Sequence, residues 1–481
     1  MKLKFYGRVP ELQLLENYYA QGESRLIALY GRRRVGKSLL LEKFSNEKLV
    51  YKFVGLAPDE KISADDQRQF FAKTLMGYGI PAIQTDDWSH LFRLLALKVE
   101  GKKAVIIFDE ISWMATGDPT FLPKLKSDWD EHFKLKSKVL LILCGSISSW
   151  IQKNILASSG FVGRVDHVLE IKPLPLKDCN KFFQDREISD YEKFKVLSVT
   201  GGIPLYLNAF DFSQPFEKNI ERLCLSSGGL LLREFEVIFH DLFDKRAGVY
   251  KKIVESLVSR SLEASEIAKA IDWEPSGVLT DYLEDLSTAG FISRDFLWDF
   301  DSGKVSKLSR YRLSDNYLRF YLKCLQPHKE KIEQRGMTSS FLTLMDLPSW
   351  PGILGLQFEN LVLQNREVLW EALGYSARDI VSDNPFFQKK NTKQPGCQID
   401  YLIQTRHHNL IVCEIKFSKN VLGLEVAEEI KSKMKAFKRP KSFACFPVLI
   451  EVSGVQDSVL DSQVFMKILD FGEFLKGKTA A

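Results

Sequence analysis

Short apolar runs alternate with amphipathic stretches from residue 9 to residue 172. The runs contain few polar positions, which is typical of strands buried on both faces of a parallel sheet. We place these strands near residues 25–31, 50–56, 103–109, 139–145 and 166–172. The intervening stretches repeat apolar residues at helical spacing, near residues 9–20, 37–47, 64–77, 88–100 and 120–135. The alternation predicts a mostly parallel α/β sheet over residues 1–172.

The pattern changes after residue 172. Residues 173–245 have helical periodicity, interrupted by the turn-like Gly201-Gly202-Ile203-Pro204, and we expect a helical lid there. Proline and glycine residues recur over 326–352, which predicts a linker. A last α/β unit follows over residues 353–481.

Residues 246–325 predict a separate small domain. Helical periods are followed by two short strand-like segments, and we place these five elements near 249–259, 263–271, 275–289, 291–294 and 311–313. Three helices and a hairpin are typical of a winged helix. The third helix carries Asp281, Glu284 and Asp285 and no basic residue, so it would face DNA phosphates badly. We therefore expect this domain to bind a protein partner or clamp the chain internally. Contact with nucleic acid through the basic hairpin residues stays open for Lys304, Lys307, Arg310 and Arg312.

The first predicted strand leads into a glycine-rich phosphate loop, and a helix follows it. The loop and the start of the helix comprise Gly31, Arg32, Arg33, Arg34, Val35, Gly36, Lys37, Ser38 and Leu39. In such a loop, backbone N–H groups and the helix dipole attract phosphates. Lys37 is placed to reach the β- and γ-phosphates, and the Ser38 hydroxyl to ligate Mg²⁺. The strand before the loop and the helix after it argue against a chance match, so the sequence predicts ATP and Mg²⁺ as cofactors.

Polar residues end the next two apolar strands. Asp109 would hold Mg²⁺ through water, and Glu110 would orient and deprotonate the attacking water. An ordinary strand that ends in two acids is the alternative. Ser146 is a candidate sensor of the γ-phosphate. Arg164 is a candidate finger that supplies positive charge in the transition state, within or across subunits, and a plain surface arginine fits the sequence equally well.

Composition and charge limit the class of protein. A chain of 481 residues is long enough for about three domains. The net charge is only +5, so a nucleic-acid surface would have to come from local clustering of basic residues. The 7 cysteines form no C-x-x-C pair, which favours reduced thiols. No apolar run approaches the roughly 18 residues that span a bilayer, and the amino terminus has no signal-peptide pattern. We expect a cytoplasmic protein without a membrane partner.

The last α/β unit carries a second group of charged residues inside apolar strands. Asp400 lies in one predicted strand, and Glu414 and Lys416 lie on one face of the next. Two carboxylates there can share a divalent metal, and Lys416 can position a water. Glu359 lies on a predicted helix that could lean over the same site. The alternative is the charged face of an edge strand, but charges within apolar strands are costly unless they are used.

A basic run follows these strands. Its members are Lys431, Lys433, Lys435, Lys438, Arg439 and Lys441. A basic surface beside a carboxylate site suits a phosphodiester substrate, which makes nucleic acid the expected partner. A solvated helix face explains the run equally well. The neighbouring pair His407-His408 lies in a predicted turn and is expected to be exposed.

The metal hypothesis requires a particular hairpin register. A four-residue turn would pair Thr405 with Leu410 and send Asp400 and Glu414 to opposite faces. A five-residue loop would pair Gln404 with Leu410 and set Asp400 opposite Glu414. A three-residue loop, or a bulge that changes parity, would also return the two acids to one face. An even loop in a regular hairpin would leave a binding module without a metal site.

These motifs together resemble the archaeal-type ATPases of the STAND class of P-loop proteins. Phe5-Tyr6-Gly7-Arg8 is similar to the opening motif of that family, which implies that Arg8 belongs with the nucleotide-binding residues. Gly202-Ile203-Pro204 resembles its G-x-P motif, and the segment from Tyr311 to Phe320 is similar to the one that follows its winged helix. If the serine strand inserts beside the phosphate-loop strand, the sheet has the arrangement of the additional-strand ATPases. The C-terminal unit resembles the PD-(D/E)xK nuclease-like domain often fused to these ATPases.

The resemblance leaves two principal interpretations and one weaker alternative. In the first, the protein is an ATP-regulated, metal-dependent nuclease. In the second, it is an ATP-driven switch whose C-terminal domain only binds a nucleic acid or a protein. A transcription regulator that uses the winged helix is the weaker third. A homo-oligomer is compatible with each of them.

Overall fold

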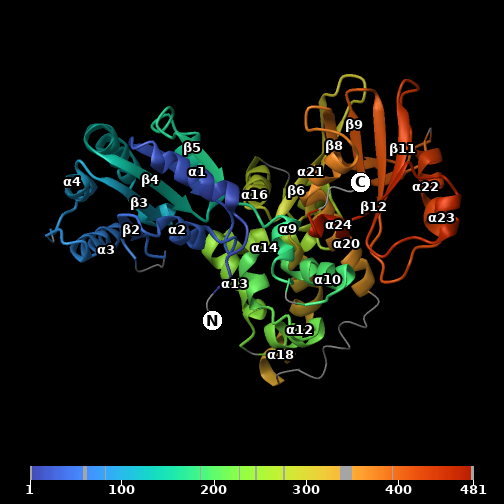
Figure 1. The fold of residues 1–481 in the computed structure, drawn as a ribbon, viewed down its shortest axis with the longest axis horizontal. Coiled ribbons are helices and arrows are strands. Elements are labelled where there is room, and N and C mark those ends of the chain that lie inside the picture. Colours follow the sequence, from blue (N-terminus) through green and yellow to red (C-terminus); the bar gives the residue numbers. More distant parts are fainter. Residues whose placement is uncertain are drawn as a thin grey trace. The chain divides into compact units, whose positions relative to one another are not determined.

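The computed structural model describes residues 3–57, 62–81, 83–184, 186–226, 228–243, 246–274, 277–335, 349–392 and 394–477. The chain divides into two compact units, each described by itself below (Figure 1). The first comprises residues 1–173 and 237–247, and the second comprises residues 174–236 and 248–481. No described helix is both long and apolar enough to cross a membrane. All seven cysteines are free thiols, as expected from their spacing.

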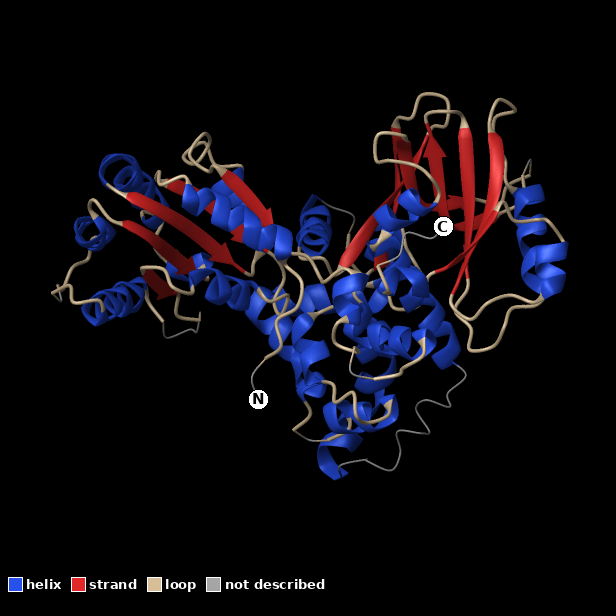
Figure 2. Ribbon diagram, viewed as in Figure 1, coloured by secondary structure: helices blue, strands red, loops and turns tan. Residues whose placement is uncertain are grey.

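The first unit is built on a five-stranded parallel sheet with helices around it (Figure 2). The strands in chain order are β1 (Arg25–Tyr30), β2 (Val50–Val54), β3 (Lys103–Asp109), β4 (Lys138–Gly145) and β5 (His167–Glu170). Their spatial order is β2-β3-β4-β1-β5. The five strands predicted from apolar runs are therefore present. The serine strand β4 does lie between the phosphate-loop strand β1 and the glutamate strand β3.

Helices cover this sheet where helical periodicity predicts them. They are α1 (Val9–Ala20), α2 (Lys37–Ser45), α3 (Ala64–Gly77), α4 (Trp88–Val99), α5 (Ile111–Met114), α6 (Phe121–Asp128), α7 (Lys134–Lys136) and α8 (Ser148–Ile151). The helix expected over 120–135 is α6 continued by a π-helical turn, Trp129–Phe133. Aromatic rings join the layers: Phe53 of β2 stacks on Phe71 of α3 with ring centroids 4.1 Å apart. Because β1, β3 and β4 run parallel, their carboxyl ends lie at one edge of the sheet.

The helical part of the second unit begins at Leu174. Its helices are α9 (Leu176–Asn180), α10 (Asp190–Thr200), α11 (Pro204–Ala209), α12 (Phe216–Cys224), the start of α13 (Leu230–Phe243), α14 (Ala247–Ser256), α15 (Ala264–Ala270) and α16 (Gly277–Thr288). The hairpin β6 (Ile292–Trp298) and β7 (Val305–Leu313) follows α16, in the order predicted from the sequence. Gly201 and Gly202 both have positive φ and end α10, which explains the interruption seen in the helical pattern.

The expected linker over 326–352 is helical at both ends. After α17 (Asn316–Phe320), the chain continues through helical turns into α18 (Lys329–Arg335). Residues 336–348 lie outside the described part of the chain. Helix α20 (Ser349–Gln364) begins four residues before 353, because Pro351 occupies its first turn, where a missing N–H removes no helical hydrogen bond. The interpretation of residues 349–352 as linker was therefore wrong.

A second five-stranded sheet forms the carboxyl-terminal part of this unit. Its strands are β8 (Ile380–Gln388), β9 (Cys397–Thr405), β10 (Asn409–Ile415), β11 (Ala444–Glu451) and β12 (Lys467–Asp470). They lie in the order β12-β11-β10-β9-β8, antiparallel on the β8 side and parallel on the β12 side. The associated helices are α21 (Arg366–Ala372), α22 (Glu425–Ala436), α23 (Asp457–Asp461) and α24 (Gly472–Leu475).

The register of the β9–β10 hairpin is the one that the metal hypothesis needs. Gln404 pairs with Leu410, and Tyr401 pairs with Cys413. The three residues 406–408 lie between the two strands, so the connection has an odd number of residues. The same register places Asp400 opposite Glu414, on one face of the hairpin.

Buried amide side chains join three helices of the second unit. Asn316 of α17 donates a hydrogen bond to the backbone carbonyl of Gln357 at 3.1 Å. Gln357 of α20 donates to the carbonyls of Ser198 (2.9 Å) and Asn316 (2.6 Å). Asn360 donates to the side-chain oxygen of Asn316 at 3.0 Å. Helix α20, which carries Glu359, is therefore fixed to α10 and α17 by satisfied polar groups.

The phosphate-loop glycine Gly31 is required by close packing as well as by its backbone conformation. A Cβ at this position would lie 2.2 Å from the backbone oxygen of Ile171. We expect Gly31→Ala to lower the free energy of unfolding of the first unit by about 3 kcal/mol or more and to abolish nucleotide binding. Thermal unfolding and binding of a fluorescent ATP analogue measure both effects. The matched control is Gly77→Ala at the end of α3, where an added Cβ meets nothing within 4 Å. Equal stability of the two variants would contradict the prediction.

Candidate functional site

The phosphate loop connects β1 to α2 with the geometry of an anion-binding turn. Arg34 and Gly36 have positive φ values of 72° and 94°, and Gly36 is the N-cap of α2. Positive φ turns successive N–H groups toward one side, and the helix dipole adds to the attraction for anions. Arg33 lies over the ring of Trp113, with its guanidinium carbon 5.9 Å from the ring centroid. A side chain of the loop thus anchors it to Trp113 of α5.

Lys37 is buried at the centre of the loop. Its ammonium donates hydrogen bonds to the backbone oxygens of Gly31 (2.7 Å) and Arg32 (3.1 Å). Burial lowers the pKa of Lys37 below its ordinary value, and the nearby charges of Glu110 and Asp109 oppose this shift. A phosphate anion at the loop would add a further negative charge beside this buried ammonium.

Asp109 and Ser38 converge beside the loop. The Ser38 hydroxyl lies 3.5 Å from Oδ2 of Asp109, and the same oxygen lies 2.9 Å from the ammonium of Lys52. A hydroxyl and a carboxylate are the oxygen donors that Mg²⁺ prefers, so the residues fit the metal predicted for this position. Sequence reasoning missed Lys52. Its signal was a single lysine between Tyr51 and Phe53 in an otherwise apolar strand.

Glu110 follows β3 in a left-handed conformation, with φ of 53°. For a non-glycine residue this conformation is costly, and such strain is concentrated at functional sites. Both the backbone N–H and the hydroxyl of Ser146 donate to Oε2 of Glu110, at 3.0 and 2.9 Å. The structure thus brings the two predicted residues together. Ser146, expected to sense a phosphate, here holds the carboxylate of the candidate base.

The buried side chain of Arg8 contacts the backbone of the phosphate loop. It is 5% exposed and donates to the backbone oxygens of Val35 (3.0 Å) and Lys172 (2.5 Å), and to Glu11 at 3.0 Å. These contacts of Arg8 join the phosphate loop to the segment after β5.

Arg164 pairs with Asp130 in this structure. Its Nε lies 3.0 and 2.9 Å from the two carboxylate oxygens, and one terminal nitrogen lies 2.8 Å from Oδ2. The two groups form a bidentate ion pair, which raises the pKa of Arg164. A role as a finger would require this pair to open.

The second group of predicted residues meets on the β9–β10 hairpin. Glu414 is 1% exposed, and its two oxygens contact Lys416 at 3.0 Å and Lys433 at 2.5 Å. Asp400 accepts a hydrogen bond from the backbone N–H of Ile415 at 3.0 Å. The ammonium of Lys433 lies 3.7 Å from the other oxygen of Asp400. Both acids thus face the same lysine, as the register requires.

Burial and nearby negative charge favour the protonated forms of Asp400 and Glu359. Burial, followed by the charge of Glu414, raises the pKa of Asp400 to about 6. Burial and the charge of Asp400 raise the pKa of Glu359 to about 7, although Arg312 and Arg319 oppose the shift. Glu359 of α20 therefore lies within electrostatic reach of Asp400, as proposed from its place in the sequence.

Lys433 was assigned to the basic run and not to this site. On α22 it follows the buried Val426 and Ile430 at helical spacing, so it shares their sheet-facing side. That spacing was a usable signal. Burial alone would lower the pKa of Lys433, but Asp400 and Glu414 outweigh it and raise the pKa. Within the described residues, no group of three or more His, Cys, Asp or Glu side chains is arranged to hold a metal ion.

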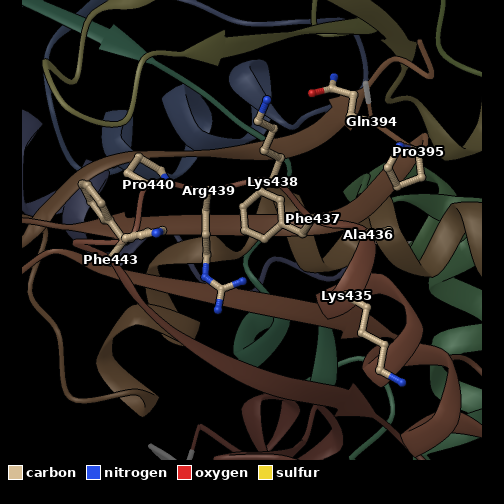
Figure 3. A pocket seen from close by; sticks show the side chains of 10 residues that line it. Gln394, Pro395, Lys435, Ala436, Phe437, Lys438, Arg439, Pro440 and Phe443 are labelled. Atoms are coloured by element: carbon tan, nitrogen blue, oxygen red, sulfur yellow. The ribbon is translucent and has the colours of Figure 1, made fainter. Parts of the chain in front are cut away.

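An open groove of about 550 Å³ lies at the end of α22. It is lined by Gln394, Pro395, Lys435, Ala436, Phe437, Lys438, Arg439, Pro440, Lys441 and Phe443. In Figure 3, the Lys438 and Arg439 side chains extend to opposite sides of the Phe437 ring. Four of the lining residues are basic and none is acidic. Phe437 and Phe443 are buried at 4% and 5% exposure, so the groove offers charge without a stacking platform.

Residues 5–210 match the sequence model of an ATPase domain found predominantly in Archaea. This chain contains an archaeal-type ATPase domain. The match includes the phosphate loop, Asp109, Glu110 and Ser146, and it extends beyond the first unit into α11.

Individual proteins also resemble the chain, over stretches of different length. An uncharacterised protein of Methanocaldococcus jannaschii is 29% identical over 335 residues, covering 69% of this chain and 71% of that protein. An uncharacterised ATP-binding protein of the same organism is 46% identical over 46 residues, or 10% of this chain and 78% of that protein. Among solved structures, the Walker-type ATPase of Pyrococcus abyssi is 18% identical with a TM-score of 0.49, covering 66% of this chain and 96% of that one.

The hydrogen bond from Ser146 to Glu110 gives a test of the ATPase site. We expect Ser146→Ala to lower ATP turnover by about one to two orders of magnitude, because a hydrogen bond to a charged group contributes about 1.5–3 kcal/mol. Nucleotide affinity should stay within about twofold. Glu110→Gln serves as the reference that binds ATP without turnover, and Ser149→Ala on the following helix serves as the control. Wild-type turnover in Ser146→Ala would contradict the assigned role.

Proposed function

We propose that this protein is an ATP-binding and ATP-hydrolysing switch whose carboxyl-terminal domain is a metal-dependent nuclease acting on nucleic acid. The observation that carries the nuclease half is the odd loop of the β9–β10 hairpin, which sets Asp400 and Glu414 on one face. The ATPase half rests on the archaeal-type ATPase domain and the geometry of its phosphate loop.

The arrangement around Lys37 supports binding and hydrolysis of ATP. The loop N–H groups and Lys37 would hold the β- and γ-phosphates, and Ser38 with Asp109 would hold Mg²⁺. The bound metal would neutralise charge on the phosphates. Glu110 would take the proton of the attacking water, since Ser146 already holds its carboxylate near the end of β4.

The charges around Asp400 support a cation site. The ammonium of Lys433 contacts both carboxylates and occupies the place that a metal cation would take. Two carboxylates are a hard donor set that suits Mg²⁺ or Mn²⁺, and Glu359 could add a third oxygen. A metal there would polarise a phosphodiester oxygen. Lys416 would remain beside it to position the water, because it contacts Glu414 on the side opposite Lys433.

The groove at the end of α22 supports nucleic acid as the substrate. Its basic residues would contact phosphates, and its buried aromatic rings leave no surface for base stacking. Binding would then be independent of sequence and sensitive to salt. The groove is close to the carboxylate site along the chain, because its lining residue Lys435 follows Lys433 by two residues on α22.

The domain over 246–325 fits an internal clamp better than a nucleic-acid reader, if it is a winged helix. Arg310 contacts Glu266 at 3.1 Å, and the buried Arg312 contacts Asp295 at 3.0 Å. These two basic residues of the hairpin are therefore engaged within the unit. Lys304 and Lys307 are exposed, so a protein partner or a weak polyanion contact would use them.

One observation favours the second interpretation, a carboxyl-terminal binding module without cleavage. Lys433 and Lys416 already neutralise the carboxylates, and the described residues form no three-ligand metal group. In that case the groove would bind nucleic acid or an acidic protein, and ATP would regulate the binding.

Cleavage of supercoiled plasmid and single-stranded DNA with Mg²⁺ or Mn²⁺ separates the two interpretations. We expect metal-dependent cleavage that ATP changes, and its loss by at least about 100-fold in Asp400→Asn, which removes one charged oxygen donor. ATP hydrolysis should persist in that variant. Lys37→Ala should abolish the ATP effect and leave basal cleavage intact. Undiminished cleavage in Asp400→Asn would exclude the site, and binding without cleavage would favour the second interpretation.

The groove predicts a salt dependence for DNA binding. Each phosphate contact contributes about −0.9 to the slope of log affinity against log salt on duplex DNA, so four contacts give about −3.6. We expect Lys438→Gln with Arg439→Gln to reduce the slope by about 1.8 and to weaken binding equally for all sequences. Fluorescence anisotropy at several salt concentrations measures this. Lys431→Gln, on the preceding helix α22 and paired with Glu428, is the control. An unchanged slope in the double variant would place the DNA elsewhere.

A further inference from the structure

Helix α22 delivers one positive charge into the carboxylate site. Its buried residues Val426, Ala427 and Ile430 face the sheet, and Lys433 continues that side of the helix. The lysine ammonium lies 2.5 Å from Glu414 and 3.7 Å from Asp400, on oxygens that both point toward it. No other described contact joins these two acids to a common cation. The cation that contacts both acids therefore comes from helix α22 and not from the β9–β10 hairpin.

Asp400 and Glu414 need the charge of Lys433 because the other nearby lysine, Lys416, is shared with Glu429. Lys416 contacts Glu414 at 3.0 Å but also binds Glu429 at 2.5 Å. Glu414 is 1% exposed, so water contributes little to its solvation. Two nearby carboxylates in such surroundings repel each other and are stable together only beside a cation. Lys433 supplies that cation in this structure.

We propose that Lys433 is a built-in counter-cation that occupies the position of the divalent metal, so that metal binding must displace it. The proposal rests on the nuclease function proposed above and concerns how its metal site is regulated. Lys433 and a divalent ion compete for the same carboxylate oxygens. Metal binding has to break the ion pairs of Lys433, so the observed binding free energy is smaller by the free energy of those pairs. The Lys433 side chain is 26% exposed, which gives it a path to solvent. The resting protein therefore binds metal weakly, and any event that withdraws Lys433 strengthens metal binding.

The test measures Mn²⁺ affinity in the full-length chain by calorimetry and by electron paramagnetic resonance of the free ion. All variants carry Asp109→Asn, which removes the carboxylate of the nucleotide site. We expect Lys433→Met to bind Mn²⁺ at least about tenfold more tightly than the parent, a change that corresponds to about 1.4 kcal/mol. Lys433→Arg keeps the charge and should bind like the parent. Lys431→Met, an exposed lysine of the same helix, should also be unchanged.

Thermal unfolding provides an independent measurement. In chelator, Lys433→Met should unfold at a lower temperature than the parent, because two buried carboxylates lose a partner. Saturating Mn²⁺ should raise its midpoint by more than it raises that of the parent. A purely structural lysine would produce the first effect without any gain in metal affinity.

The remaining outcomes separate the two proposals. If Lys433→Met binds Mn²⁺ no more tightly than the parent, while Glu414→Gln abolishes binding, the metal site stands and the displacement proposal is overturned. If neither the parent nor Lys433→Met binds Mn²⁺ up to millimolar concentration, both the metal-dependent function and the displacement proposal fail. Calorimetric unfolding of each variant confirms that the affinities refer to folded protein.

Discussion

The cost of burying a carboxylate governs both groups of candidate residues. A carboxylate removed from water is stable only when a positive charge or several hydrogen-bond donors replace the lost solvation. Asp109 meets this requirement with Lys52 of the adjacent strand, and Glu414 meets it with Lys416 and Lys433. In both places a lysine of the chain itself supplies the compensating positive charge.

Much of the first unit could be predicted because its signals are local. Strands buried on both faces of a parallel sheet are continuous apolar runs, and the phosphate loop is one contiguous motif. The position of β4 between β1 and β3 was expected only through the resemblance to the additional-strand ATPases, and the strand order has it there. The register of the β9–β10 hairpin could be predicted less completely. Parity limited it to a few registers, but only the folded loop, with His408 at φ of 57°, selects the pairing of Gln404 with Leu410.

The partners of the site residues could not be predicted with the same success. That Ser146 bonds Glu110 depends on the spacing of two strand ends that are 36 residues apart in sequence. Lys52 and Lys433 lie on elements whose facing is decided by tertiary packing, although both carried a periodic signal in retrospect. The start of α20 was misplaced for a different reason. Pro351 is a helix breaker in the interior but is compatible with a first turn, and composition alone does not distinguish the two positions.

The amide network of Asn316, Gln357 and Asn360 bears on how such a chain can be divided or recombined. These side chains form hydrogen bonds with one another and with a carbonyl of α10. Helix α20 is therefore bound to the helices that precede it in the chain. A cut near residue 349 would separate Asn316 from Gln357 and Asn360 and break the hydrogen bonds between them. Replacing the chain after residue 349 alone would therefore break bonds that tie α20 to α10 and α17, so a replacement that keeps this network includes those two helices.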